Sequence, residues 1–156
     1  MSGTNWTIGI DFGTSNTAAA HTNPVKGTVE AVNLSHNRTT MSSSVYVESP
    51  EQIDVGDVAM DKAESNPAGF IPAPKRVIPQ QMFQVNGYDL SASMPVAAVL
   101  SSVVQRVSRE HGNVQPSELV LTHPEAWSSN EIKVLLDAAA QLGLSAAKIT
   151  TISEPQ

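Results

Sequence analysis

The stretch "IGIDFGTSNTAAA" at residues 8–20 joins an apolar run to an aspartate, a glycine and several hydroxyl side chains. In a tight turn between strands, the backbone N–H groups and hydroxyls of Thr14 and Ser15 can surround an anion such as a phosphate, if Gly13 lets the chain come close. Asp11, at the end of its strand, can hold a hard cation such as Mg²⁺ through water. The alternative is a plain hairpin in which Asp11 caps the turn and Gly13 supplies a positive φ. Spacing alone favours the plain hairpin.

Short strands are predicted to position this turn, because brief apolar stretches are separated by "FGTS" and "NPVKG". The predicted strands are residues 6–11, 16–22 and 29–33. Their spacing is typical of an antiparallel meander. Near the other end of the sequence, "ELVLTHP" and "KITTISEP" predict two strands with a helix between them, which implies a parallel pair joining the meander.

Two helices are expected to pack on this sheet. The first lies within residues 94–113, where six apolar residues recur at helical spacing before Gly112: Val96, Val99, Leu100, Val103, Val104 and Val107. The second begins with a capping box formed by Ser128 and Glu131 and ends at Gly143. Its apolar stripe comprises Ile132, Leu135, Leu136, Ala139 and Leu142. Trp127 is expected to pack at the entry of this helix.

The middle of the chain resembles an insertion into this α/β layout. Prolines and serines are frequent there. The stretch "RTTMSSSVYVE" predicts one more strand, and "GDVAMDKAESNP" predicts a short helix that ends at Asn66-Pro67. Residues 1–37 and 113–156 are therefore assigned to a core subdomain with a mixed sheet, and residues 38–112 to an inserted, shortened α+β subdomain.

Composition limits the classes of partner. The 156 residues carry 9 Lys and Arg against 15 Asp and Glu, a net charge of −6, which argues against binding nucleic acid or an anionic membrane. The absence of cysteine excludes disulfides and thiolate metal sites. The start has no signal-peptide pattern and no stretch is long enough to span a membrane, so we expect a cytoplasmic protein. The histidines lack the spacing of metal ligands; they are His21, His36, His111 and His123.

"IGIDFGTSNT" resembles the first phosphate motif of the actin, Hsp70 and sugar-kinase ATPases. Further segments resemble Hsp70 in order: "NRTTMSSSVYV", "VGDVAMDKAESNP", "APKRVIP" beside the Hsp70 "AKRLIG", "ELVLTHPEAWSSNEIKVLLDAAAQLGL" and "ITTISEPQ" beside "INEPTAA". The resemblance runs the full length of the chain. It implies the first lobe of an Hsp70-like nucleotide-binding domain with a ribonuclease-H-like core.

The resemblance also implies roles for individual residues. Asp11 matches the aspartate that orders water around Mg²⁺, and Thr14 and Ser15 match the pair that holds the β- and γ-phosphates of ATP. Lys75 matches the lysine that orients the attacking water and steadies charge on the γ-phosphate. This inventory suits phosphoryl transfer, which depends on positioning and charge neutralisation.

Two further residues carry roles near the end of the chain. Glu154 matches a glutamate that positions water and metal, and Pro124 matches a proline proposed to switch between nucleotide states. The chain departs from Hsp70 in reading "HPEAW" for "VPAYF" and in placing Ile132, followed by Lys133, where an arginine is usual. The segment between Pro79 and Tyr88 is also shorter than in Hsp70. These departures put the relay from nucleotide to client domain in doubt.

The second phosphate motif and the adenosine pocket of the family would follow residue 156. We therefore expect half an ATP site in a piece of a longer protein, with no hydrolysis by the piece alone and weak nucleotide binding at most. Its expected partners are the second lobe and, for the longer protein, clients and cochaperones. A second copy of the chain, bound through the exposed cleft surface, is a further expected partner.

Two other functions stay open. The first is a nucleotide-sensing or scaffold module without turnover, which Ile132 and the shortened insertion favour. The second is a bacterial actin-like filament protein, against which Lys75 argues.

Overall fold

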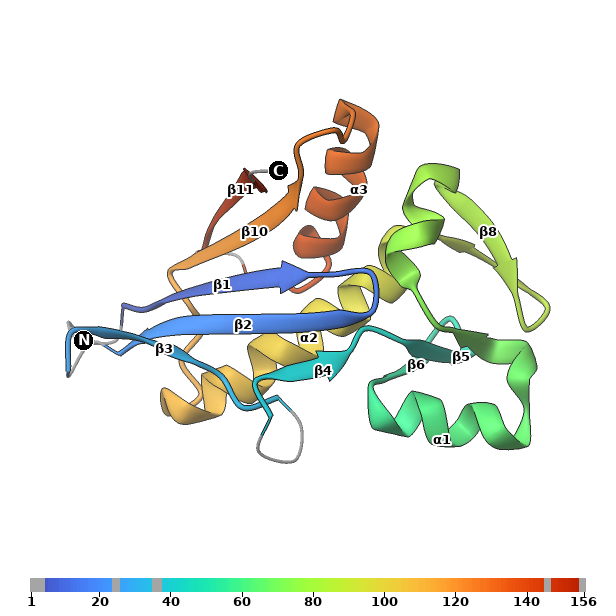
Figure 1. Ribbon diagram of the computed structural model, residues 1–156, viewed down its shortest axis with the longest axis horizontal. Helices are drawn as coiled ribbons and strands as arrows, with labels where there is room; N and C mark the ends of the chain where they lie inside the picture. The colour runs from blue at the N-terminus through green and yellow to red at the C-terminus, as the bar shows by residue number, and fades with distance from the viewer. Residues whose placement is uncertain (1–4, 24–25, 35–37, 145–146, 155–156) are drawn as a thin grey trace.

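The computed structural model describes residues 5–23, 26–34, 38–144 and 147–154. Among these, six strands form the main sheet, in the order β11-β10-β1-β2-β3, with β4 also paired to β2 (Figure 1). The strands are β1 Thr7–Phe12, β2 Asn16–Asn23, β3 Thr28–Ala31, β4 Thr40–Ser42, β10 Glu118–Pro124 and β11 Lys148–Glu154. Strand β1 pairs antiparallel with β2 and parallel with β10, which pairs parallel with β11. The predicted mixed sheet is confirmed.

Side chains along β1 alternate between a buried face and an exposed face of the sheet. Ile8, Ile10 and Phe12 are buried at 0 to 2% exposure, while Asp11 between the last two is exposed. Successive side chains of a strand point to opposite faces, so one face of β1 enters the core and the other presents the carboxylate. The buried face packs with α2, which passes behind β1 and β2 in Figure 1.

Helices α2 (Ser93–Glu110) and α3 (Ser129–Ala140) lie close to the predicted ranges. All six apolar residues predicted for the buried stripe of α2 are buried. At the start of α3 the Glu131 carboxylate accepts the Ser128 backbone N–H at 3.2 Å, which confirms the capping box. The predicted stripe of α3 is wrong at Leu136, which is 39% exposed, because the helix buries the face that carries Val134 and Ala138.

The middle of the chain folds into small elements at the right of Figure 1. They form one sheet of order β6-β5-β7, a hairpin of β8 and β9, one α-helix and two 3₁₀ helices. Their bounds are β5 Val45–Ser49, β6 Gln52–Val55, α1 Asp57–Ser65, η1 Pro67–Gly69, β7 Phe70–Ile71, η2 Pro74–Gln80, β8 Met82–Val85 and β9 Tyr88–Ser91. The predicted short helix before Asn66-Pro67 is confirmed as α1.

One prediction for this middle segment is wrong. "RTTMSSSVYVE" forms two strands in two different sheets, β4 and β5, rather than one. The change of sheet occurs at Ser43 and Ser44, both buried. The Ser43 N–H still bonds toward β2, to the carbonyl of Ser15 at 2.9 Å, whereas the Ser44 carbonyl already accepts from Gly56 after β6 at 3.0 Å.

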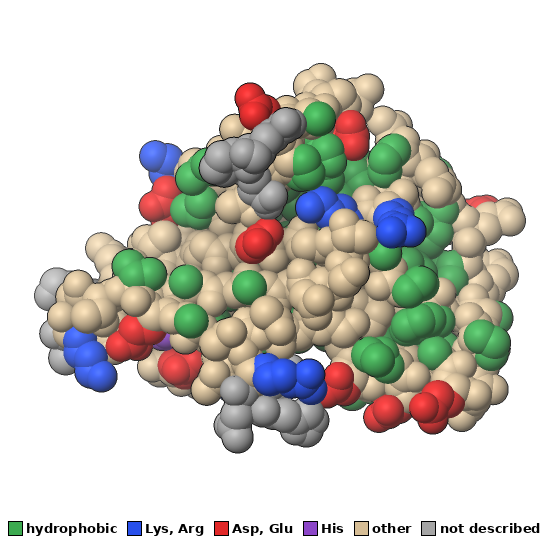
Figure 2. Space-filling view, in the orientation of Figure 1, with side chains coloured by type: hydrophobic (Ala, Val, Ile, Leu, Met, Phe, Trp, Pro, Cys, Tyr) green, Lys and Arg blue, Asp and Glu red, His purple; other side chains and the backbone are tan. Residues whose placement is uncertain are grey.

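Figure 2 shows hydrophobic side chains gathered over this middle segment, whereas Lys and Arg form small separate groups on the same face. Exposed apolar residues of the segment include Val58, Met60, Met82 and Tyr88. None of the helices in the described ranges combines the length and apolar character that a membrane crossing requires.

Candidate functional site

The carboxyl ends of the parallel strands bring three of the predicted site residues to one edge of the sheet. Asp11 stands near the end of β1, Pro124 ends β10 and Glu154 ends β11, with Pro124 paired opposite Glu154. In open α/β sheets, ligands bind at this edge. The Asp11 carboxylate is exposed and accepts a hydrogen bond from the Thr122 hydroxyl at 3.2 Å.

The turn after β1 is tight and is closed by a backbone hydrogen bond. The Gly13 N–H donates to the carbonyl of Asn16 at 3.0 Å, which closes the turn. Within the described part of the chain, the N–H groups of Thr14 and Ser15 have no protein acceptor. These two amides are therefore free to bind an anion beside Asp11.

Gly13 is required for space rather than for its φ angle. Its φ is not positive, so the hairpin interpretation that assigned it a positive φ is wrong on this point. A Cβ at this position would collide with the carbonyl oxygen of Asn16. The tight return of the chain at Asn16 therefore excludes every side chain at residue 13.

A serine far away in the sequence fixes the carbonyl side of the turn. The buried Ser43 hydroxyl donates to the Gly13 carbonyl at 3.0 Å and lies 2.8 Å from the buried Thr17 hydroxyl. The Ser43 N–H holds the Ser15 carbonyl. Ser43 therefore binds the carbonyls of Gly13 and Ser15. The amides of Thr14 and Ser15 have no protein acceptor in the described structure and can bind a ligand. Sequence reasoning missed this role, because the contact joins residues 30 positions apart and leaves no local pattern.

Lys75 lies on the 3₁₀ helix η2 and is half-buried. Its ammonium nitrogen is 5.5 Å from the ring centroid of Trp127, within the range of a cation–π interaction. Among the described residues, no hydrogen bond or ion pair joins Lys75 to Asp11 or to the turn. The structure thus places the predicted catalytic lysine with Trp127, whose role sequence reasoning had limited to packing.

Two other predicted positions are placed only in part. Glu154 is paired through its backbone at the end of β11, but its side chain lies outside the described residues. Ile132, which replaces the arginine usual in Hsp70, is half-buried in the first turns of α3.

Two of the four histidines, His21 and His111, lie together at the opposite end of β1. His21 Nδ1 and His111 Nε2 are 2.8 Å apart, and His111 stacks on Trp6 with ring centroids 3.9 Å apart. Burial is the main cause that lowers the pKa of His111, followed by the neighbouring His21, whereas Glu110 raises it. His123 lies instead beside Trp127, and His36 falls outside the described residues.

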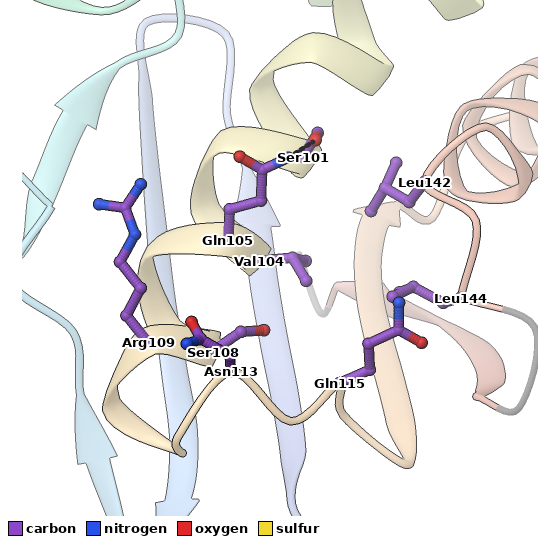
Figure 3. Close-up of a pocket in the computed structure, with 9 residues that line it drawn as sticks. All are labelled: Ser101, Val104, Gln105, Ser108, Arg109, Asn113, Gln115, Leu142 and Leu144. Carbon is purple, nitrogen blue, oxygen red and sulfur yellow. Dashed lines mark hydrogen bonds between the residues drawn. The ribbon is translucent and has the colours of Figure 1, made fainter.

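A separate pocket of about 350 Å³ lies between the second half of α2 and the segment that follows α3 (Figure 3). Hydroxyl, amide and leucine side chains line it together with Arg109, whose side chain in Figure 3 points away from Leu142 and Leu144. Because its lining includes no carboxylate or histidine, this pocket lacks an acid–base pair. We therefore place the candidate site at the carboxyl edge of the sheet.

Comparison with known proteins shows similarity to chaperones over nearly the whole chain. The chain is 30% identical over 151 residues to the chaperone protein DnaK of Picrophilus torridus, 29% to that of Endomicrobium trichonymphae and 31% over 152 residues to that of Elusimicrobium minutum. Each match covers 95% of this chain. DnaK is an Hsp70. The sequence is thus distantly similar to a region of the Hsp70 chaperones over nearly its whole length.

The match covers only part of those chaperones. The chain spans 24% of the length of these three DnaK proteins. No family model matches the chain. The mixed sheet and the Hsp70 similarity agree with each other, because such a sheet is compatible with an Hsp70 ATPase lobe.

Proposed function

We propose that this chain is the first lobe of an Hsp70-like nucleotide-binding domain with a ribonuclease-H-like core. The observation that carries the proposal is the turn after β1, where the amides of Thr14 and Ser15 have no acceptor in the described structure and stand beside the exposed carboxylate of Asp11. The similarity to DnaK along 95% of the chain supports the same assignment. In this proposal the turn binds the β- and γ-phosphates of ATP.

The donor set at the edge of the sheet fits a magnesium nucleotide. Asp11 offers exposed carboxylate oxygens, which are hard ligands suited to Mg²⁺ bound through water. The metal would supply charge neutralisation at the phosphates. The chain itself supplies the amides of Thr14 and Ser15, and Lys75 contributes a positive charge that can steady the γ-phosphate. Glu154 is proposed to position water, and Pro124 to respond to the nucleotide state.

The proposal also divides the chain into two subdomains. Residues 1–37 and 113–156 are assigned to the core subdomain and residues 38–112 to the shortened insertion, from which β4 and α2 pack with the main sheet. ATP would bind between this lobe and a second one, and the longer protein would couple nucleotide binding or hydrolysis to protein clients. This lobe alone would bind nucleotide weakly and would not hydrolyse it.

The test is a calorimetric titration of Mg·ATP and Mg·ADP into the protein encoded by the complete gene, with phosphate release recorded on the same samples. We expect Asp11→Ala to weaken Mg·ATP binding, and Lys75→Ala to abolish phosphate release while binding persists. Lys26→Ala and Asp61→Ala are the matched controls, because both side chains are exposed, Lys26 between β2 and β3 and Asp61 on α1. Neither control should change binding or release.

Other outcomes select other functions. Binding without release in the unmodified protein would identify a nucleotide-sensing scaffold, and ATP-dependent sedimentation of filaments would identify an actin-like protein. If neither nucleotide binds, the turn at residues 13–15 is only a hairpin, and the proposal is wrong.

A further inference from the structure

The ammonium group of Lys75 is held by an aromatic ring rather than by a carboxylate. Within the described residues, Lys75 has no ion pair or hydrogen bond, and its nitrogen lies 5.5 Å from the centroid of Trp127. Indole is the aromatic ring that attracts cations most strongly, through the negative face of its π-system. Among the described residues, the side chain that contacts the Lys75 ammonium is therefore the ring of Trp127.

Trp127 is in turn fixed to the end of β10. Its backbone N–H donates to the carbonyl of Pro124 at 3.1 Å, and its ring lies nearly parallel to that of His123, with centroids 6.0 Å apart and planes 9° apart. His123 is buried, and its Nδ1 lies 2.9 Å from the same Pro124 carbonyl. The ring that holds Lys75 is thus anchored at the edge where Asp11 and the turn lie.

We propose that Trp127 is a positioning residue for Lys75: its indole face holds the ammonium at the end of β10 until a phosphate group draws it away. This inference rests on the function proposed above. A cation–π contact at a partly exposed site is weaker than a charge-assisted hydrogen bond to phosphate, so phosphate wins the competition. The flexible four-carbon stem of lysine allows the ammonium to move between the two partners.

The first test needs no nucleotide. Lysines are dimethylated with ¹³C-formaldehyde, which keeps their charge, and the Lys75 signal is identified by its loss in Lys75→Ala. We expect an upfield ring-current shift of this signal, lost in Trp127→Leu and largely retained in Trp127→Phe. The signals of Lys62 and Lys133, which pair with carboxylates, are internal controls and should not change.

A structural role of Trp127 alone would not produce this pattern. Leucine preserves apolar packing but has no π-face, so circular dichroism should show that Trp127→Leu stays folded. If Trp127→Leu does not fold, the Lys75 signal of the unmodified protein decides, because only a ring face near the ammonium shifts it upfield. An unshifted Lys75 signal in the unmodified protein, or the same shift in Trp127→Leu, would overturn the positioning role.

The second test adds Mg·ATP to the protein from the complete gene. We expect the Lys75 signal to return toward its unshifted position. We also expect Trp127→Leu to bind Mg·ATP about two- to fivefold more tightly, because the competing cation–π contact is gone. If ATP binds but the Lys75 signal does not move, displacement by phosphate is wrong. If ATP does not bind at all, the proposed function fails, while the ring-current test still decides the positioning role.

Discussion

Replacing His111 by alanine should destabilise the protein at the end of the sheet opposite the candidate site. His111 stacks on Trp6 with centroids 3.9 Å apart and planes 6° apart, and its Nε2 lies 2.8 Å from Nδ1 of buried His21. An aromatic pair contributes about 0.5–1.5 kcal/mol beyond burial. A hydrogen bond contributes about as much, so the free energy of unfolding should fall by about 1–3 kcal/mol. The melting temperature should fall by about 2–4 °C per kcal/mol for a chain of this length.

This loss should depend on pH. The two ring nitrogens share one proton, so the hydrogen bond requires one of the histidines to stay neutral as the acceptor. Burial holds the pKa of His111 below its usual value in the folded protein, so the unfolded chain binds the proton more tightly. The stabilisation is then complete above about pH 6.5 and is lost as the pH falls through the folded pKa.

Other charged side chains lie near the pair of histidines. The Glu30 carboxylate lies 3.9 Å from Nε2 of His21, and Glu110 raises the pKa of His111 against the larger effect of burial. Arg109 and Glu110 lie at the end of α2 beside His21 and line the same pocket. The neighbouring His21 adds to burial in lowering the pKa of His111.

Urea unfolding followed by far-ultraviolet circular dichroism measures the effect at about pH 8 and about pH 5. His111→Phe is the matched variant, because it preserves a stacked ring on Trp6 but has no nitrogen to share with His21. We expect His111→Ala to lose most stability at the higher pH, and His111→Phe to lose less there and to show a weaker pH dependence. Equal pH dependence in the unmodified protein and His111→Phe would refute the reasoning.

Two predictions concern the turn after β1. Ser43→Ala should lower the free energy of unfolding by about 1–3 kcal/mol in urea, because it leaves the Thr17 hydroxyl and the Gly13 carbonyl without their buried partner; an unchanged midpoint would show that Ser43 does not brace the turn. Gly13→Ala should destabilise by at least about 1 kcal/mol and weaken Mg·ATP binding, since its Cβ would collide with Asn16. Gly9→Ala is the control: a Cβ there meets nothing within 4 Å, so equal losses in the two variants would contradict the role assigned to Gly13.

The sequence could predict those parts of the fold that local periodicity determines. The alternation in β1 and the helical spacing in α2 each lead to a single arrangement with a buried face, and both arrangements occur. The middle segment could not be predicted at the same level. Its strands are two to five residues long, too short for a periodicity to be read, and 3₁₀ helices there take the place of regular elements.

The candidate site was predictable as a set of residue types but not as a set of contacts. The proposed phosphate turn consists of adjacent residues, so Asp11, Gly13 and the two hydroxyl residues could be named from the sequence. Ser43 is 30 residues from Gly13. Lys75 and Trp127 are 52 positions apart in the sequence, on a 3₁₀ helix and on the connection between β10 and α3. Such pairings depend on tertiary packing and leave no local pattern.

These contacts differ in strength in a way that suits a phosphate site. The turn is held by hydrogen bonds from a buried serine, so its amides keep a fixed geometry before any ligand arrives. Lys75 is held only by a ring face, a contact that a phosphate can replace without breaking a buried hydrogen bond. A rigid turn and a releasable cation at one sheet edge therefore allow the anion to bind first and the lysine to follow. That order predicts that Lys75→Ala leaves the amide-bound phosphates in place, which is the separation of binding from phosphate release that the calorimetric test measures.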